Sequence, residues 1–66
     1  MVIKKGDIFL SYRENHPTER VMALMDYEKE CLLYCTNKNG DDVFVKEHEI
    51  GEFLGNIEAL NINSHK

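Results

Sequence analysis

The sequence predicts a mainly β domain of five short strands, with one short helical turn near the C-terminus. Three observations predict this fold class. Residues 8–13 alternate with a period of two, as the side chains of a strand do. Polar residues gather at 26–30, between two strand-like stretches. Asn39-Gly40 is the strongest hairpin signal in the chain, because both residues tolerate positive φ in a type I′ turn.

The first predicted strand follows the Gly6-Asp7 turn. Its alternation puts one set of side chains on one face (Ile8, Leu10 and Tyr12) and the other set on the opposite face (Phe9, Ser11 and Arg13). We expect Phe9 to lie on the outer face, where it would cover an open end of a small barrel. Pro17 then marks a loop over 15–18, because proline fixes its own φ and biases the preceding residue away from the helical region.

Residues 19–36 have two interpretations, a helix or a hairpin. In the helix, Thr18 is the N-cap, and Glu28 falls in the middle of the apolar face. In the hairpin, strands at 21–25 and 31–36 flank a polar turn at 26–30. We favour the hairpin, because the polar residues cluster at one point and the second arm is rich in residues that suit strands. The next hairpin then has 31–36 and 43–46 as its arms.

The C-terminal part changes character after Lys46. Ile50, Phe53 and Leu54 recur at helical spacing, which predicts one turn of helix, of the α or 3₁₀ type. Gly55 is the expected stop, and 56–60 would form a short closing strand. Residues 61–66 are polar and are expected to fray, so the predicted domain spans 1–60.

The length and composition indicate one small domain. A chain of 66 residues buries roughly 60% of the surface that it exposes when unfolded. Neither a signal peptide nor an apolar run of ~20 residues is recognisable, so we expect a cytoplasmic protein. Cys31 and Cys35 are expected to be reduced, because residues four apart in a strand lie roughly 13 Å apart. That separation exceeds the ~7 Å between Cα atoms that a disulfide can span.

The charge is unevenly distributed. The net charge is −4, and residues 41–52 carry all of it, because the acids and bases elsewhere cancel. We call the five acids of this stretch the acidic segment: Asp41, Asp42, Glu47, Glu49 and Glu52. They suit either a solvated rim that blunts an edge strand or a docking surface for a basic surface of a partner protein. An alternative apolar interface would use Phe9, Met22 and Tyr34.

Catalytic and metal-binding patterns are not recognisable in the sequence. Cys31 and Cys35 with the three histidines (His16, His48 and His65) lack the second close ligand pair of a structural zinc site. A nucleophile needs a neighbouring base, and so short a chain has little room for a substrate pocket of several hundred Å³. We therefore expect no cofactor, no metal and no enzymatic activity.

Two stretches carry a family resemblance. Lys5-Gly6-Asp7-Ile8 and residues 39–50, which end in Lys-Glu-His-Glu-Ile, resemble small SH3-like β-barrel proteins of phages and prophages. The resemblance covers about residues 4–60 and implies a small barrel. It carries no catalytic residue to this chain, because those proteins share a fold plan and not an activity. The chain lacks the tryptophan and the clustered aromatics that line a groove for proline-rich ligands.

These observations favour a non-enzymatic protein-interaction module, which as the resemblance implies would be encoded by a phage or prophage. One alternative is a nucleic-acid-associated domain that uses five basic residues: Lys4, Lys5, Arg13, Arg20 and Lys38. The net negative charge disfavours it, because affinity for nucleic acid comes mainly from Lys and Arg on phosphate. Another alternative is a homo-oligomeric structural protein, such as a homodimer. No membrane association is expected.

Overall fold

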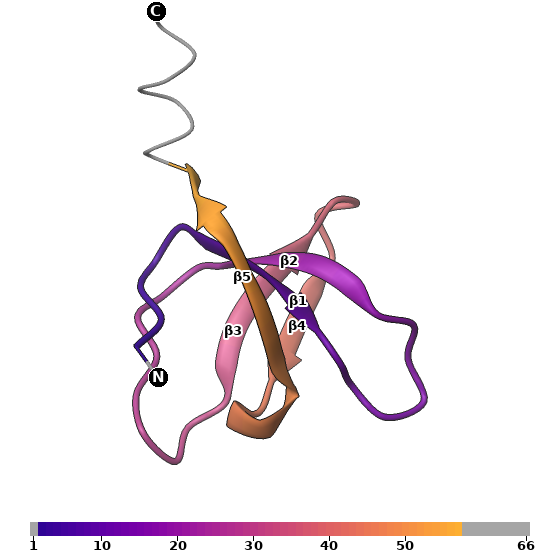
Figure 1. Ribbon diagram of the computed structural model, residues 1–66, viewed down its shortest axis with the longest axis horizontal. Helices are drawn as coiled ribbons and strands as arrows, with labels where there is room; N and C mark the ends of the chain where they lie inside the picture. The colour runs from indigo at the N-terminus through magenta and orange to yellow at the C-terminus, as the bar shows by residue number, and fades with distance from the viewer. Residues whose placement is uncertain (1, 58–66) are drawn as a thin grey trace, which may run out of the picture.

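The computed structural model describes residues 2–57, which form one antiparallel sheet of five strands (Figure 1). The strands are β1 (Asp7–Ser11), β2 (Glu19–Ala23), β3 (Leu33–Asn37), β4 (Asp42–Val45) and β5 (Ile50–Asn56), and a 3₁₀ turn, η1 (Glu47–Glu49), joins the last two. Their order in the sheet is β4-β3-β2-β1-β5. The predicted mainly β class is confirmed. Within the described residues β4 and β5 are edges that do not pair, so the sheet is not closed as a barrel.

One hydrophobic core lies on the inner face of the sheet. Its buried members come from all five strands and from the N-terminal segment: Ile3, Phe9, Val21, Ala23, Leu33, Cys35, Val43, Val45 and Ile50. Alternate residues of β2, β3 and β4 supply this set, as the period of a strand requires. Because all five strands reach the same cluster, the sheet must curl around it, and Figure 1 shows β5 crossing over the neighbouring strands.

The predicted outer position of Phe9 is wrong. Phe9 is 0% exposed and lies in the core, whereas Ile8 and Leu10 are half-buried on the other face and Tyr12 is 50% exposed. Two polar residues share the inward phase with Phe9, and the fold satisfies both. The Ser11 hydroxyl donates to the Glu19 carbonyl oxygen over 3.3 Å. The Asp7 carboxylate accepts from the Lys4 backbone N–H and from the Asn56 side chain.

The hairpin interpretation of 19–36 is confirmed. Strand β2 pairs antiparallel with β3, with Met22 opposite Thr36 and Ala23 opposite Cys35. Beyond these strands the Leu24 N–H donates to the Tyr34 carbonyl oxygen over 2.9 Å. The second arm starts later than predicted, at Leu33, and leaves Cys31 and Leu32 exposed.

The Asn39-Gly40 turn joins β3 to β4 with a geometry that differs in part from the prediction. Gly40 has the expected positive φ, +82°, but Asn39 does not share it, so the turn is not of type I′. Instead, the Gly40 N–H donates to the Asn37 carbonyl oxygen, and the Asn37 N–H donates to that of Asp41. The Asn37 side-chain oxygen also accepts from the backbone N–H groups of Asn39 and Asp41, which fixes the loop.

The helical turn predicted after Lys46 is present as the 3₁₀ turn η1. The residues whose spacing predicted it are not helical, however, because Ile50, Phe53 and Leu54 belong to the seven-residue strand β5. The closing strand predicted at 56–60 starts earlier than expected, because Asn56 is the last residue of β5 and Ile57 already lies beyond the strand. Residues 58–60 of that strand, and the predicted tail at 61–66, lie outside the described residues.

Gly51 allows β5 to approach β1 closely, so we expect Gly51→Ala to destabilise the fold. An added Cβ would overlap the ring of Tyr12 and lie 2.8 Å from the Leu10 carbonyl oxygen. The Tyr12 ring is exposed and can move aside, whereas the Leu10 backbone is fixed by the pairing of its strand. The substitution should therefore lower the free energy of unfolding by about 1–3 kcal/mol. Urea unfolding would measure it, with Glu52→Ala on the same strand as the control. Equal stability of Gly51→Ala and wild type would show that β5 does not pack this closely.

Candidate functional site

The outer face of the sheet carries side chains in rows that the strand register defines. One row runs from Ile8 on β1 through Met22 and Thr36 to Asp42 on β4. Beside it, Tyr34 of β3 is opposite Phe44 of β4. All of these residues are half-buried or exposed. This face, on the side opposite the core, is therefore the candidate functional surface.

Tyr34 links an acid of the acidic segment to an aromatic pair. Its ring stacks on Phe44, with 5.3 Å between the ring centroids and 23° between the ring planes. Its hydroxyl donates a hydrogen bond to Asp42 Oδ1 over 2.8 Å. Phe44 is 51% exposed, so the pair keeps a ring surface open to solvent. We call these three residues the acidic–aromatic surface.

The hydrogen bond to Asp42 raises the pKa of Tyr34 above its ordinary value. Ionisation would remove the donated proton and place a phenolate beside a carboxylate, so both the lost bond and the repulsion favour the neutral phenol. Tyr27 repeats the arrangement, because its hydroxyl donates to Glu47 Oε1 over 2.6 Å and this bond raises the pKa of Tyr27. Two carboxylates of the acidic segment are thus held by tyrosines.

The five acids fall into separate groups. Asp41 and Asp42 lie where β4 begins, and Glu47 and Glu49 lie in the turn that follows its end. Strand β4 spans roughly 10 Å between its first and last Cα atoms at about 3.3 Å per residue, and it separates the two groups. Glu52 is exposed on β5. Two more of these carboxylates are fixed locally: Asp41 accepts from the Asn37 side chain, and Glu49 accepts from the Lys46 N–H at the start of η1.

The predicted apolar interface is brought together only in part. Met22 and Tyr34 lie on the outer face, but Phe9 is buried in the core and cannot contribute to it. Phe44, which the sequence analysis did not select, stands beside Tyr34 instead. Its alternation with Val43 and Val45 was the signal that could have found it, because two inward valines require the residue between them to face outward.

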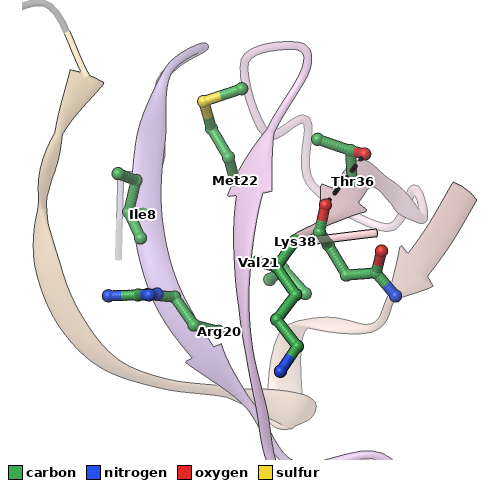
Figure 2. Close-up of a pocket in the computed structure, with 7 residues that line it drawn as sticks. Ile8, Arg20, Val21, Met22, Thr36 and Lys38 are labelled. Carbon is green, nitrogen blue, oxygen red and sulfur yellow. Dashed lines mark hydrogen bonds between the residues drawn. The ribbon is translucent and has the colours of Figure 1, made fainter. Parts of the chain in front are cut away.

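A groove of about 240 Å³ lies over β1, β2 and β3 on this face (Figure 2). Ile8, Met22 and Thr36 line it, and Arg20 and Lys38 supply two cations. In the view of Figure 2 the Arg20 side chain runs over β1, and the Lys38 side chain lies on the other side of β2. A neighbouring groove of about 220 Å³ shares Met22 and includes Lys5. Three of the five basic residues selected from the sequence therefore line grooves around Met22.

Among residues 2–57, neither cation of the groove forms an ion pair. Within residues 2–57 the one ion pair joins Arg13 Nη2 to Glu19 Oε2 over 3.2 Å. Glu19 also accepts from the Asn37 side chain through its other oxygen. Glu19 therefore neutralises Arg13, whereas Arg20 and Lys38 have no carboxylate within ion-pair distance in the described chain.

The two cysteines are free thiols, as predicted, and they differ in environment. Cys31 is exposed and Cys35 is buried in the core. Burial raises the pKa of the Cys35 thiol from 9.0 to about 12, because the low-dielectric interior disfavours the thiolate. Across residues 2–57 no three His, Cys, Asp or Glu side chains are grouped to hold a metal ion. Over the same span there is no helix long and apolar enough to cross a membrane.

Comparison with protein-family models, with curated proteins and with solved structures gives no match for this chain. The two features of the outer face are therefore interpreted from their own chemistry. They are the acidic–aromatic surface on β3 and β4 and the groove that Arg20 and Lys38 line.

Reactivity should separate the two thiols. Iodoacetamide at neutral pH should modify Cys31 in the folded protein and leave Cys35 unmodified, because the buried thiol is inaccessible and its raised pKa removes the thiolate. Denaturation without reductant should then allow modification of both, which mass spectrometry would count. A mass two daltons below that of the dithiol, with no modification after denaturation, would instead reveal a disulfide.

Titration should detect the Tyr34–Asp42 hydrogen bond. Asp42→Asn removes the carboxylate charge, so the pKa of Tyr34 should fall toward the ordinary value of 10.0, while that of Tyr27 stays raised. Because folding raises the Tyr34 pKa in wild type, the bond's stabilising effect is full below pH 10 and is lost as the pH rises through the folded value. Ultraviolet difference spectra of wild type and Asp42→Asn would follow the ionisation of tyrosine, and Tyr34→Phe would identify the part that belongs to Tyr34. If the Tyr34 titration is the same in wild type and in Asp42→Asn, the hydrogen bond between Tyr34 and Asp42 is refuted.

Proposed function

We propose that this chain is a non-enzymatic protein-interaction module, and that it binds a basic surface of a partner protein through its acidic segment. One observation carries the proposal: Tyr34 stacks on the exposed Phe44 ring and holds the Asp42 carboxylate beside it. An anionic group and an open aromatic face are thus presented together on the sheet surface. That combination suits a cationic side chain better than an anionic or a purely apolar ligand.

A partner's lysine or arginine can use both parts of this surface. Its cationic head gains from the face of an aromatic ring, by about 0.5–2 kcal/mol depending on exposure, and from a charge-assisted hydrogen bond to the carboxylate. The Tyr34 hydroxyl occupies one oxygen of Asp42 and orients the group before binding. Less side-chain freedom is then lost in the complex, which favours affinity.

The separated acids suit an extended basic surface rather than a single residue. Asp41 and Asp42 lie at one end of β4, and Glu47, which Tyr27 holds, lies beyond the other. Basic residues roughly 10 Å apart on a partner would face both groups. Such exposed charges act mainly on the rate of encounter, since electrostatic steering accelerates association.

We also propose that the chain is related to the SH3-like barrel proteins of phages and prophages, and that it acts in the cytoplasm. The order of its parts supports the kinship: a strand, a loop, a β-meander, a 3₁₀ turn and a last strand. The two free thiols suit a reducing compartment. The nucleic-acid alternative is weaker, because Glu19 holds Arg13 and the carboxylate of Asp42 lies one strand from the groove with Arg20 and Lys38.

Charge-neutralising variants test the proposed function. Asp41→Asn/Asp42→Asn and Glu47→Gln/Glu49→Gln/Glu52→Gln should each slow association with a partner captured from the host, change dissociation less, and flatten the salt dependence. The amide oxygens of Asn and Gln preserve the acceptors for Tyr34, Tyr27 and the Lys46 N–H, so the fold should persist. Stopped-flow kinetics on the purified pair would measure both rates.

The matched control is Glu14→Gln/Glu28→Gln, which changes the net charge as much as Asp41→Asn/Asp42→Asn does, at two exposed sites outside the acidic segment. If this control slows association as much as the segment variants do, only the overall charge matters. If neither segment variant differs from wild type in its association rate or salt slope, the acidic segment is only a solubilising rim.

A further inference from the structure

We infer that a second copy of this chain is one partner of the acidic–aromatic surface, and that the groove lined by Arg20 and Lys38 is the basic surface that it binds. The two copies would then associate through their outer faces as a symmetric dimer. The inference rests on the proposed function, because it names the partner of the same acidic surface. Its support is the charge and shape of the groove, together with its place on the sheet.

The groove has the chemistry that the acidic–aromatic surface needs. Arg20 and Lys38 supply two positive charges that no carboxylate of residues 2–57 neutralises within ion-pair distance. Ile8 and Met22 supply apolar surface beside them. An aromatic ring fits against these two side chains, while a carboxylate next to the ring reaches the cations. Phe44, on which the Tyr34 ring stacks, and Asp42, which accepts from the Tyr34 hydroxyl, are such a pair.

The strand register makes the outer face self-complementary. Along one row, Asp42 of β4 is level with Met22 of β2 and Ile8 of β1, and Thr36 of β3 lies between them. A two-fold axis that lies above β3 and is inclined to it exchanges the two sides of the face and makes the strands of the two copies cross. Such a rotation moves Asp42 of each copy from the level of Met22 toward Arg20 and Lys38 of the other copy, and it moves Phe44 toward Ile8 and Met22. Every contact between acid and groove then occurs twice, as in isologous dimers.

Local attraction can exceed the repulsion between two chains of net charge −4. The charges that meet at the interface are in contact, whereas the remaining acids lie farther away. At physiological salt the Debye length is roughly 8 Å, so the distant repulsion is screened more than the contacts are. The Glu47 and Glu49 group lies at the far end of β4 from Asp42, which places it away from the proposed contacts with Arg20 and Lys38.

Sedimentation equilibrium over micromolar to millimolar concentrations tests the inference. Wild type should rise from 7.7 kDa to twice that mass. Arg20→Glu/Lys38→Glu and Asp41→Lys/Asp42→Lys should each weaken self-association at least tenfold, because each variant opposes like charges across the interface. An equimolar mixture of the two variants should recover the doubled mass, because their reversed charges are again complementary. All four positions are exposed, so circular dichroism should confirm that both variants fold.

The control variant is Lys4→Glu/Lys29→Glu, which makes the same charge change at exposed sites outside the groove and should keep the doubled mass. A wild-type mass of one chain at millimolar concentration would overturn the inference. A dimer that both charge-reversed variants preserve would overturn it too, because another face would then be the interface. Binding of fluorescent oligothymidine that is lost in Arg20→Glu/Lys38→Glu would assign the groove to nucleic acid instead. None of these results decides the proposed function. That proposal is tested separately, by the rates at which the acidic-segment variants associate with a different protein.

Discussion

The burial of Phe9 is the constraint on which the rest of the structure depends. It is the one aromatic side chain that residues 2–57 bury fully, and the chain has no tryptophan to share that role. Because side chains alternate along a strand, turning Phe9 inward turns Ile8 outward. Pairing between β1 and β2 then places Ile8 beside Met22 and Leu10 beside Arg20. The position of one ring in the core thereby sets the floor of the groove and one of its cations.

Local sequence patterns were sufficient to place β2, β3 and β4. They were insufficient for the direction in which the side chains of β1 face and for the last strand, β5. The hairpin of β2 and β3 and the positive φ of Gly40 follow from turn chemistry and alternation. The inward phase of β1 does not, because it buries Ser11, which donates to Glu19, and Asp7, which accepts from Lys4 and Asn56. Glu19 and Asn56 become neighbours of these residues only in the folded sheet. Likewise, the helical spacing of Ile50, Phe53 and Leu54 conceals a strand that Gly51 allows to lie against Tyr12.

The candidate site also has one part that the sequence predicts and another that only the structure reveals. Counting charges was sufficient to select the acidic segment, since its net charge is a property of consecutive residues. The stack of Tyr34 on Phe44, and the meeting of Arg20 with Lys38, are properties of cross-strand register, which depends on where each hairpin arm starts. With 31–36 and 43–46 taken as the arms, a pairing of Tyr34 with Phe44 cannot be derived from the sequence. Register is therefore the information that the structure adds.

The single-sided attachment of β5 has a kinetic consequence. The pairs β2–β3 and β3–β4 join residues that are close in sequence, but β5 reaches the sheet only by pairing with β1, as Phe9 and Phe53 do. Contacts that close long loops form slowly, because the loop entropy is lost before the contact is gained. The meander of β1 to β4 can thus fold early, with β5 docking last. The backbone amides of β5 should then exchange with deuterium sooner than those of β3, which has a neighbouring strand on each side.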